Sequence, residues 1–136
     1  MSILYKTEAT ATGGRTGTAR TADGALEVTL VTPKELGGPG GEGNNPEQLF
    51  AAGYAACFLS ATKFVAGQKK VKLSDDSTVT AHVGVGPRDD GQGFGLEVSL
   101  AVSLPGIDRE TAQALVDQAH IVCPYSHATR GSLNVA

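Results

Sequence analysis

The chain has 136 residues, of which 40% are hydrophobic and 18% charged, and its formal net charge is −3. These values fit one globular domain over residues 1–136, and no basic face or helix-turn-helix pattern indicates binding to nucleic acid or to an anionic membrane. The first fifteen residues have only a short apolar stretch with early charges, so we expect neither a signal peptide nor a membrane span. We therefore expect a cytoplasmic protein, in which two cysteines pair only transiently.

The N-terminal third predicts two strands followed by a glycine-rich loop. Residues 3–12 alternate weakly, residues 25–32 alternate more clearly, and Asp23-Gly24 between them is a turn signal. Residues 33–45 hold five glycines and two prolines. Such a segment is too long and irregular for an idle connection, so we expect a functional or mobile loop.

A long apolar helix is predicted from Pro46 to about residue 67. Asn45 supplies a cap, Pro46 takes the first helical position, and Gln48 completes a capping box. The residues that follow are apolar on most of the helix circumference, so we expect burial on almost all sides. This helix should be central, with a sheet on one face, and a second copy of the chain is a candidate cover for another.

The C-terminal half predicts two long strands, a helix and a last short strand. Residues 77–85 and 94–103 alternate and are joined by a turn-rich segment. Asp108 caps a helix at 109–120, and residues 133–135 form the last strand. Because strands and helices are segregated along the chain, we predict an α+β fold with antiparallel sheets packed around the long central helix.

Cys57 lies about three turns into the long helix, where the field of the helix N-terminus has largely faded. No lysine or arginine lies within one turn, so a cation that stabilises its thiolate must come from a distant part of the chain. The candidates are Arg15, Arg20 and Arg130. The alternative is a core thiol that packs as a small hydrophobe. The second cysteine argues against that alternative.

Cys123 follows the second predicted helix, and Pro124 prevents that helix from continuing through it. The end of an element allows local movement, which a thiol needs when it attacks a sulfenic acid to form a disulfide. This asymmetry suits a peroxidase in which Cys57 attacks the hydroperoxide and Cys123 resolves the product, but by themselves the two cysteines indicate little beyond redox chemistry. The spacing alone is weak support, because it fits no CxxC redox motif.

Two other chemistries use the same residue types. His120, Cys123 and His127 are types that ligate zinc, but Pro124 spoils a shared helical face and the only obvious fourth ligand is Cys57, so we expect no metal. A cysteine hydrolase, with Cys57 as the nucleophile and one of the three histidines as the base, also fits the residue types. It lacks any local signature and ranks below the peroxidase.

Four blocks of sequence resemble the organic hydroperoxide resistance branch of the OsmC family. They are TATGGRTG at 10–17, ELGGPGGEGNNPEQLFAAGYAACF at 35–58, GFGLEVSL at 93–100 and VCPYSHATRG at 122–131. The second and fourth are highly specific, and the match runs through almost the whole chain. The resemblance implies an OsmC-like fold, a thiol peroxidase without a bound cofactor, and reduction by a lipoylated protein. It also implies an intertwined homodimer with two active sites at the subunit interface.

Matching positions imply a role for each site residue. Cys57 corresponds to the peroxidatic cysteine and Cys123 to the resolving one. Arg15 corresponds to the activating cation, and Glu47 to the acid that holds Arg15. Many members of the family carry asparagine where this chain has His127; we expect no change in the reaction type, although a histidine there could alter the pH dependence.

The spacing of two of these residues predicts a site composed of residues from two subunits. Glu47 and Cys57 are ten residues apart on one helix, so their backbones are about 15 Å apart. One arginine head group does not comfortably reach both. We therefore expect antiparallel pairing of two such helices, which brings Glu47 of one subunit near Cys57 of the other.

Four aromatic residues near the predicted thiolate are candidates for a substrate pocket: Phe50, Tyr54, Phe58 and Phe94. A pocket of this kind favours alkyl or fatty-acid hydroperoxides over H2O2, because each buried CH2 group contributes about 0.8 kcal/mol. The alternative function is a non-catalytic binding module for a small apolar ligand, in which Cys57 is inert.

Overall fold

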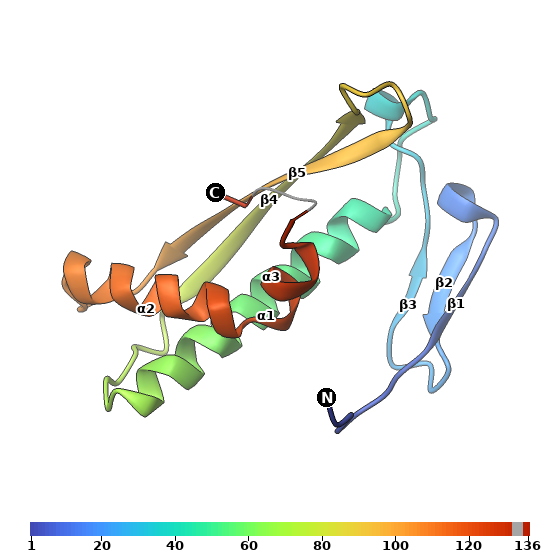
Figure 1. Ribbon diagram of the computed structural model, residues 1–136. Coiled ribbons are helices and arrows are strands. Elements are labelled where there is room, and N and C mark those ends of the chain that lie inside the picture. Colours follow the sequence, from blue (N-terminus) through green and yellow to red (C-terminus); the bar gives the residue numbers. More distant parts are fainter. Residues whose placement is uncertain (132–134) are drawn as a thin grey trace. The chain divides into compact units, whose positions relative to one another are not determined.

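A computed structural model describes residues 1–131 and 135–136 of the chain (Figure 1). The chain forms two compact units, Met1–Leu49 and Phe50–Ala136, and the boundary between them falls near the start of the long helix. The expectation of a single domain over residues 1–136 stays a prediction.

The first unit contains a three-stranded antiparallel sheet in the order β1-β2-β3, formed by Ala9–Thr12, Thr18–Thr21 and Glu27–Thr29. The strands expected at 3–12 and 25–32 are therefore shorter than predicted, and β2 was not predicted. None of the residues in these strands is buried. A sheet with no buried face leaves no hydrophobic alternation from which its strand ends could be read.

The glycine-rich loop is irregular, as predicted, apart from one short 3-10 helix at Lys34–Leu36. It ends in the predicted capping box. Asn45 Oδ1 accepts a hydrogen bond from the backbone N–H of Gln48 at 2.9 Å, and Gln48 Oε1 accepts one from the N–H of Asn45 at 3.1 Å. These reciprocal bonds satisfy two of the free amides at the start of α1, Pro46–Gln68.

Helix α1 packs on a two-stranded antiparallel sheet, β4 (Thr78–Pro87) and β5 (Phe94–Ser103), which runs along it in Figure 1. Tyr54 and Phe58 of α1 form a buried cluster with Val98 at the centre of β5. Both long strands and the sheet-covered face of α1 confirm the sequence-based expectations.

The burial of α1 is less complete than predicted. The buried residues among its 23 are Tyr54, Phe58, Ala61, Thr62, Val65 and Ala66, and the side chain of Phe64 is 57% exposed. The expectation of burial on almost all sides is therefore wrong for the single chain, because the chain's own elements cover only part of the helix.

Two helices complete the second unit. Helix α2, Arg109–Val122, begins where the Asp108 carboxylate accepts a hydrogen bond from the backbone N–H of Thr111 at 3.0 Å, as predicted. Helix α3, Pro124–Thr129, was not predicted. Pro124 ends α2 and also starts α3, since proline is well suited to the first helical position.

The last strand expected, at 133–135, lies mostly outside the described residues. Val135 itself is described and forms an isolated parallel bridge with Val98. The antiparallel pairing of β1-β2-β3 and of β4-β5, with the long helix α1, confirms the α+β class. The homodimer stays a prediction.

The second buried cluster generates a prediction for stability. Leu115 of α2 is fully buried against Val65 and Leu104. Replacing Leu115 with alanine is expected to lower the free energy of unfolding by about 2–5 kcal/mol, because a cavity remains where the side chain was. Chemical denaturation measures this loss. Gln118→Ala, on the exposed face of the same helix, serves as the control and should change stability by less than about 0.5 kcal/mol.

Candidate active site: an ion pair and a thiol pair

Arg15 and Glu47 form a two-pronged ion pair within the first unit. Arg15 Nη2 donates to Glu47 Oε1 at 2.6 Å, and Arg15 Nη1 donates to Oε2 at 2.8 Å. Glu47 is largely buried, whereas 37% of the Arg15 side chain is exposed. The hydrogen bonds from Arg15 hold the pKa of the Glu47 carboxyl below its usual range, and desolvation of the carboxyl partly opposes this shift. The structure thus contains the Arg15–Glu47 contact that the family resemblance implied.

The loop around Arg15 is shaped by a close backbone approach. Arg15 lies in a short 3-10 helix, Gly14–Thr16. A Cβ atom at Gly17 would lie 1.7 Å from the carbonyl oxygen of Thr12, so only glycine fits where the chain leaves this turn. The hydroxyl of Thr32 donates to the carbonyl oxygen of Arg15 at 3.4 Å and adds a weak second anchor. The backbone of Arg15 is therefore fixed by local packing.

Cys57 and Cys123 meet within the second unit. Both are free thiols, and Cys123 Sγ donates to Cys57 Sγ at 3.6 Å. A disulfide requires about 2.05 Å, so a small movement of either side chain closes the bond. Cys123 is fully buried, whereas Cys57 is partly exposed. The fold brings together the two cysteines that the sequence paired.

The backbone holds Cys123 at a junction between two helices. Its N–H donates to the carbonyl oxygen of Ala119 at 2.8 Å and ends α2, and its own carbonyl oxygen accepts from the N–H of His127 at 3.0 Å in α3. The expectation that Cys123 lies at the end of an element is confirmed. Because α2 ends at Val122 and α3 begins at Pro124, Cys123 is the one residue between the two helices, and its backbone has little room to move.

Burial raises the pKa of the Cys57 thiol above its ordinary value. A hydrogen bond from the backbone of Tyr125 acts in the opposite direction, and the neighbouring Cys123 raises the pKa further. Among the residues that the structure describes, no lysine or arginine contributes to this shift. Burial thus outweighs the contribution of Tyr125, and the expectation that a cation from a distant part of the chain activates the thiol stays a prediction.

The four aromatic residues predicted to line a substrate pocket have different environments. Tyr54 and Phe58 are fully buried core residues, Phe50 is partly buried beside them, and the side chain of Phe94 is 70% exposed. Their role in substrate binding stays a prediction. Arg130, a candidate cation, donates instead to the carbonyl oxygen of His120 at 2.7 Å.

Two residues of the site were not found from the sequence. The ring of Tyr125 packs on Tyr54 and Phe50, with centroids 5.8 and 6.3 Å away, and its backbone lowers the pKa of the Cys57 thiol. The buried Ser126 bonds Tyr54 through its hydroxyl. Both lie in the sequence block that carries Cys123. In that block Pro124 occupies the first position of α3, and this proline was the one sequence signal from which α3 could have been predicted.

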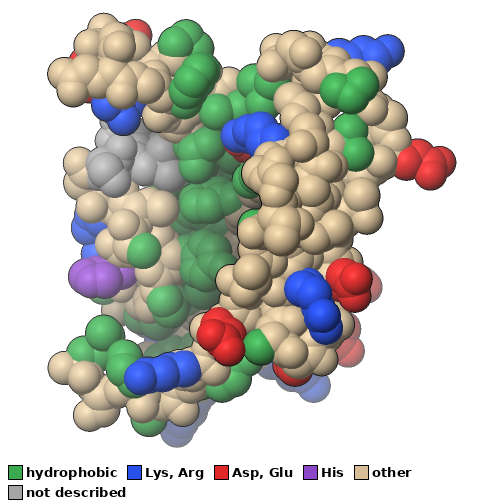
Figure 2. Space-filling view, turned by 90° about the vertical axis from the view of Figure 1, so that its right-hand side faces the viewer, with side chains coloured by type: hydrophobic (Ala, Val, Ile, Leu, Met, Phe, Trp, Pro, Cys, Tyr) green, Lys and Arg blue, Asp and Glu red, His purple; other side chains and the backbone are tan. Residues whose placement is uncertain are grey.

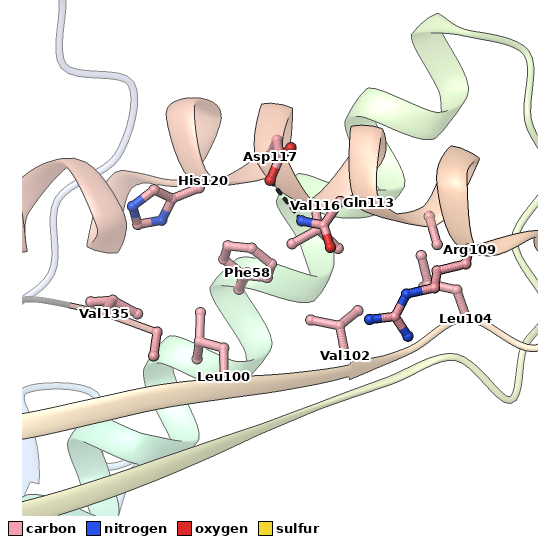
Figure 3. Close-up of a pocket in the computed structure, with 12 residues that line it drawn as sticks. Phe58, Leu100, Val102, Leu104, Arg109, Gln113, Val116, Asp117, His120 and Val135 are labelled. Carbon is pink, nitrogen blue, oxygen red and sulfur yellow. Dashed lines mark hydrogen bonds between the residues drawn. The ribbon is translucent and has the colours of Figure 1, made fainter.

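A cavity of about 500 Å³ lies between α2 and β5 (Figure 3). Phe58, Leu100 and Val102 give it apolar walls, whereas α2 contributes polar groups, among them the hydrogen-bonded pair Gln113 and Asp117. Neither cysteine is among the described residues that line it. A ligand in this cavity would therefore touch Phe58 but not the thiols.

On the face drawn in Figure 2, Lys, Arg, Asp and Glu side chains are scattered and form no concentrated charged patch. Large hydrophobic side chains that are exposed in the second unit include Phe64, Phe94 and Ile121. Within residues 1–131 and 135–136, no group of three or more His, Cys, Asp and Glu side chains is placed to hold a metal ion.

Comparison with known proteins identifies the family. The sequence profile of the OsmC-like proteins matches residues 38–136. An organic hydroperoxide resistance protein from Xanthomonas axonopodis pv. citri is 55% identical over 133 residues, which cover 98% of this chain and 92% of the relative. The crystal structure of an organic hydroperoxide resistance protein from Elizabethkingia anophelis superimposes with a TM-score of 0.92 at 51% identity, covering 99% of this chain and 95% of that one.

The α+β fold is thus that of an OsmC-like protein, and the chain belongs to this family. Its place is in the organic hydroperoxide resistance branch. The OhrB protein of Bacillus subtilis, named for the same property, is 43% identical over 97% of this chain and 95% of its own length. The resemblance that four sequence blocks indicated is confirmed.

Helix α1 is long and apolar enough to cross a membrane by length and composition alone. The core helix of a soluble protein meets the same criterion. Because Tyr54 and Phe58 are fully buried and pack on the β4–β5 sheet, α1 is a core helix.

The ion pair generates a prediction about titration. Arg15→Ala is expected to raise the pKa of Glu47, because the two hydrogen bonds that favour the carboxylate are lost. Since the folded pKa of Glu47 is depressed, the pair stabilises the protein above the unfolded pKa of about 4.3, and this contribution is lost as the pH falls through the folded pKa. Carbon-detected NMR titration of the carboxyl measures the shift. Arg20→Ala is the control, and an unchanged Glu47 pKa in Arg15→Ala would contradict the assignment.

Proposed function

We propose that this protein is a thiol-dependent peroxidase that reduces organic hydroperoxides to alcohols. The observation that carries the proposal is the contact between Cys57 Sγ and Cys123 Sγ at 3.6 Å, in which one sulfur is partly exposed and the other is buried. This asymmetry suits a pair in which the exposed thiol meets the oxidant and the buried thiol resolves it.

The family supports the biological role. Relatives from several bacteria are named for resistance to organic hydroperoxides. A role in organic hydroperoxide resistance, and hence in the response to oxidative stress, follows for this chain. We place it in the cytoplasm, where reducing conditions return the two cysteines to free thiols after each turnover.

The first step is attack of the Cys57 thiolate on the distal oxygen of ROOH. The S–O bond forms as the O–O bond breaks, the leaving alkoxide takes a proton to become ROH, and Cys57 becomes a sulfenic acid. Because burial raises the thiol pKa, a fixed cation must stabilise the thiolate. Arg15, held by Glu47, supplies that cation and also stabilises the developing negative charge on the alkoxide.

The second step is attack of the Cys123 thiol on the sulfenic sulfur. The Cys57–Cys123 disulfide forms, and the hydroxyl group leaves with the proton of Cys123 as water. No bound cofactor is needed, since the redox change resides in the two sulfurs. A dithiol then reduces the disulfide by exchange, and membership in this branch favours a lipoylated protein as its carrier.

The working unit in this proposal is a homodimer. Helix α1 is apolar around most of its circumference but only partly covered by its own chain, and Phe64 and Ile121 remain exposed. A second copy would cover these surfaces. Glu47 and Cys57 are about 15 Å apart along α1. Arg15 bonds Glu47 of its own chain, so we assign the thiolate it activates to the other subunit.

The substrate class follows from the apolar surroundings of Cys57. Phe50 and the ring of Tyr125 lie beside the helix turn that carries it, and Phe58 follows it directly. In an assembled dimer, Phe50, Tyr54, Phe58 and Phe94 are the proposed walls of a site for alkyl and fatty-acid tails. Each CH2 group that enters contributes about 0.8 kcal/mol, which favours such substrates over H2O2.

Mass measurement after one equivalent of an alkyl hydroperoxide tests the chemistry. The wild-type protein is expected to form an intramolecular disulfide, Cys123→Ser to stop at a sulfenic acid on Cys57, and Cys57→Ser to consume no hydroperoxide. A non-catalytic binding module would leave the hydroperoxide unconsumed in all three proteins. A hydrolase would turn over esters without any change in the thiols.

Subunit mixing tests the composite site. A purified heterodimer of an Arg15→Ala chain and a Cys57→Ser chain contains one complete site if Arg15 acts on the partner's thiolate, so we expect about half of the wild-type activity. If Arg15 acts within its own chain, this heterodimer is inactive.

The reciprocal heterodimer is the control. It combines a wild-type chain with a chain that carries both substitutions, and it should be inactive if Arg15 acts across the interface. Activity near half of the wild-type value in this control, with none in the first heterodimer, would overturn the composite site but leave the peroxidase proposal intact.

A further inference from the structure

A single buried hydroxyl joins the three helices that surround the thiol pair. Ser126 Oγ of α3 lies 2.7 Å from the phenol oxygen of Tyr54 on α1 and 2.9 Å from Nδ1 of His120 on α2. Ser126 and Tyr54 are fully buried. None of these three polar groups takes part in the two chemical steps proposed above for the cysteines.

The three groups form one donor–acceptor chain. Tyr54 donates to the Ser126 oxygen, and the Ser126 hydroxyl donates to an unprotonated His120 Nδ1. In this direction both buried hydroxyl protons have an acceptor, whereas the reverse direction would leave the Tyr54 proton without an acceptor in the network. Removal of one member would leave another buried group unpaired, which is costly in a dry core.

The Tyr54–Ser126 hydrogen bond and the Cys57–Cys123 contact join the same two segments of the chain. Tyr54 precedes Cys57 by three residues on α1, and Ser126 follows Cys123 by three residues in α3, so each hydrogen-bonding residue lies about one turn from a cysteine on its own helix. The Tyr54–Ser126 bond and the Cys57–Cys123 contact therefore span the same two helices. The separation fixed by the first contact sets the separation available to the second.

A close approach at Gly53 reinforces this alignment. A Cβ atom at Gly53 would lie 2.7 Å from the phenol oxygen of Tyr125, so the ring of Tyr125 occupies the space above a residue without a side chain. Tyr125 lies between Cys123 and Ser126 in the chain. The segment that carries the resolving thiol is thus seated on α1 at the two adjacent residues 125 and 126.

We propose that Ser126, with Tyr54 and His120, is a positioning residue for the resolving step, and this inference rests on the peroxidase function proposed above. The network holds Cys123 Sγ near Cys57 Sγ before oxidation, so the sulfenic acid is captured by a neighbour already in place. The step itself is unchanged: Cys57–SOH and Cys123–SH give the disulfide and water. Without the network, a second hydroperoxide competes for the sulfenic acid and carries it to sulfinic acid.

The test separates the two steps in single-turnover reactions with an alkyl hydroperoxide. Hydroperoxide loss reports the first step, and mass analysis with a sulfenic-acid trap reports the partition between disulfide and trapped sulfenic acid. Ser126→Ala is expected to keep the first-step rate within about twofold and to slow disulfide formation about tenfold, so trapped and overoxidised Cys57 accumulate. Tyr54→Phe, which removes one oxygen from an otherwise unchanged ring, should move the partition in the same direction.

Conservative variants distinguish positioning from general stability. His120→Asn places an amide near the position of Nδ1 and should restore the wild-type partition, whereas His120→Leu should not. Thr62→Val removes another buried hydroxyl of α1, which donates to the carbonyl oxygen of Phe58, and should leave the partition unchanged even if stability falls. His127→Asn changes an exposed histidine on α3 and should also leave it unchanged.

The outcomes are distinguishable. If the wild-type protein consumes no hydroperoxide, the proposed function fails. If the wild type is active but Ser126→Ala and Tyr54→Phe both form the disulfide at its rate, or if Thr62→Val shifts the partition as much as they do, the positioning role is overturned. Should Ser126→Ala fail to fold, as circular dichroism would show, Tyr54→Phe and the two His120 variants decide.

Discussion

The packing of Tyr54 and Phe58 against the β4–β5 sheet is the contact on which the rest of the second unit depends. These two fully buried side chains lie about one turn apart on α1, so together they fix the rotation of the helix about its axis. That rotation decides which side of α1 faces the junction between α2 and α3. Cys57 lies between Tyr54 and Phe58 on α1, so the packing of these two side chains in the core directs Cys57 toward Cys123.

The apolar surroundings of Cys57 have two opposite effects on the proposed reaction. An apolar environment accommodates the tail of an organic hydroperoxide, but the same environment raises the pKa of Cys57 and disfavours the thiolate. In the mechanism proposed above, the permanent guanidinium charge of Arg15 offsets that shift, and it exchanges no proton of its own near neutral pH. The two hydrogen bonds to Glu47 hold this charge in one position, because an unpaired arginine side chain would extend into solvent.

Local signals in the sequence predicted those parts of the fold that depend on local physics. The capping box of Asn45 and Gln48 needs only neighbouring residues, and the alternation of β4 and β5 follows from one buried face. Strand β2 escaped prediction because it has no buried residue, and α3 escaped because Pro124 was read only as the end of a helix. The cysteines and the ion pair were found through chemistry and family resemblance.

Ser126 could not have been found in the same way. Its partner Tyr54 is 72 residues away, and a serine in a short helix carries no mark of burial. The aromatic residues near Cys57 illustrate the same limit, since sequence position suggested one pocket for side chains that are fully buried at Tyr54 and largely exposed at Phe94. Burial depends on the complete fold, and for the exposed side chains it depends on the proposed assembly as well.

The difference in exposure between the two sulfurs orders the proposed reaction. A bulky hydroperoxide can reach only the partly exposed Cys57, so Cys123 remains a thiol until the sulfenic acid exists. If both sulfurs were equally exposed, two hydroperoxides could oxidise both, and no thiol would remain to form the disulfide. Burial of Cys123 therefore protects the resolving thiol, and the hydrogen bonds of Ser126 keep the buried thiol within reach. In the proposed mechanism, the apolar core and the polar network therefore both favour formation of the disulfide before a second hydroperoxide reacts with the sulfenic acid.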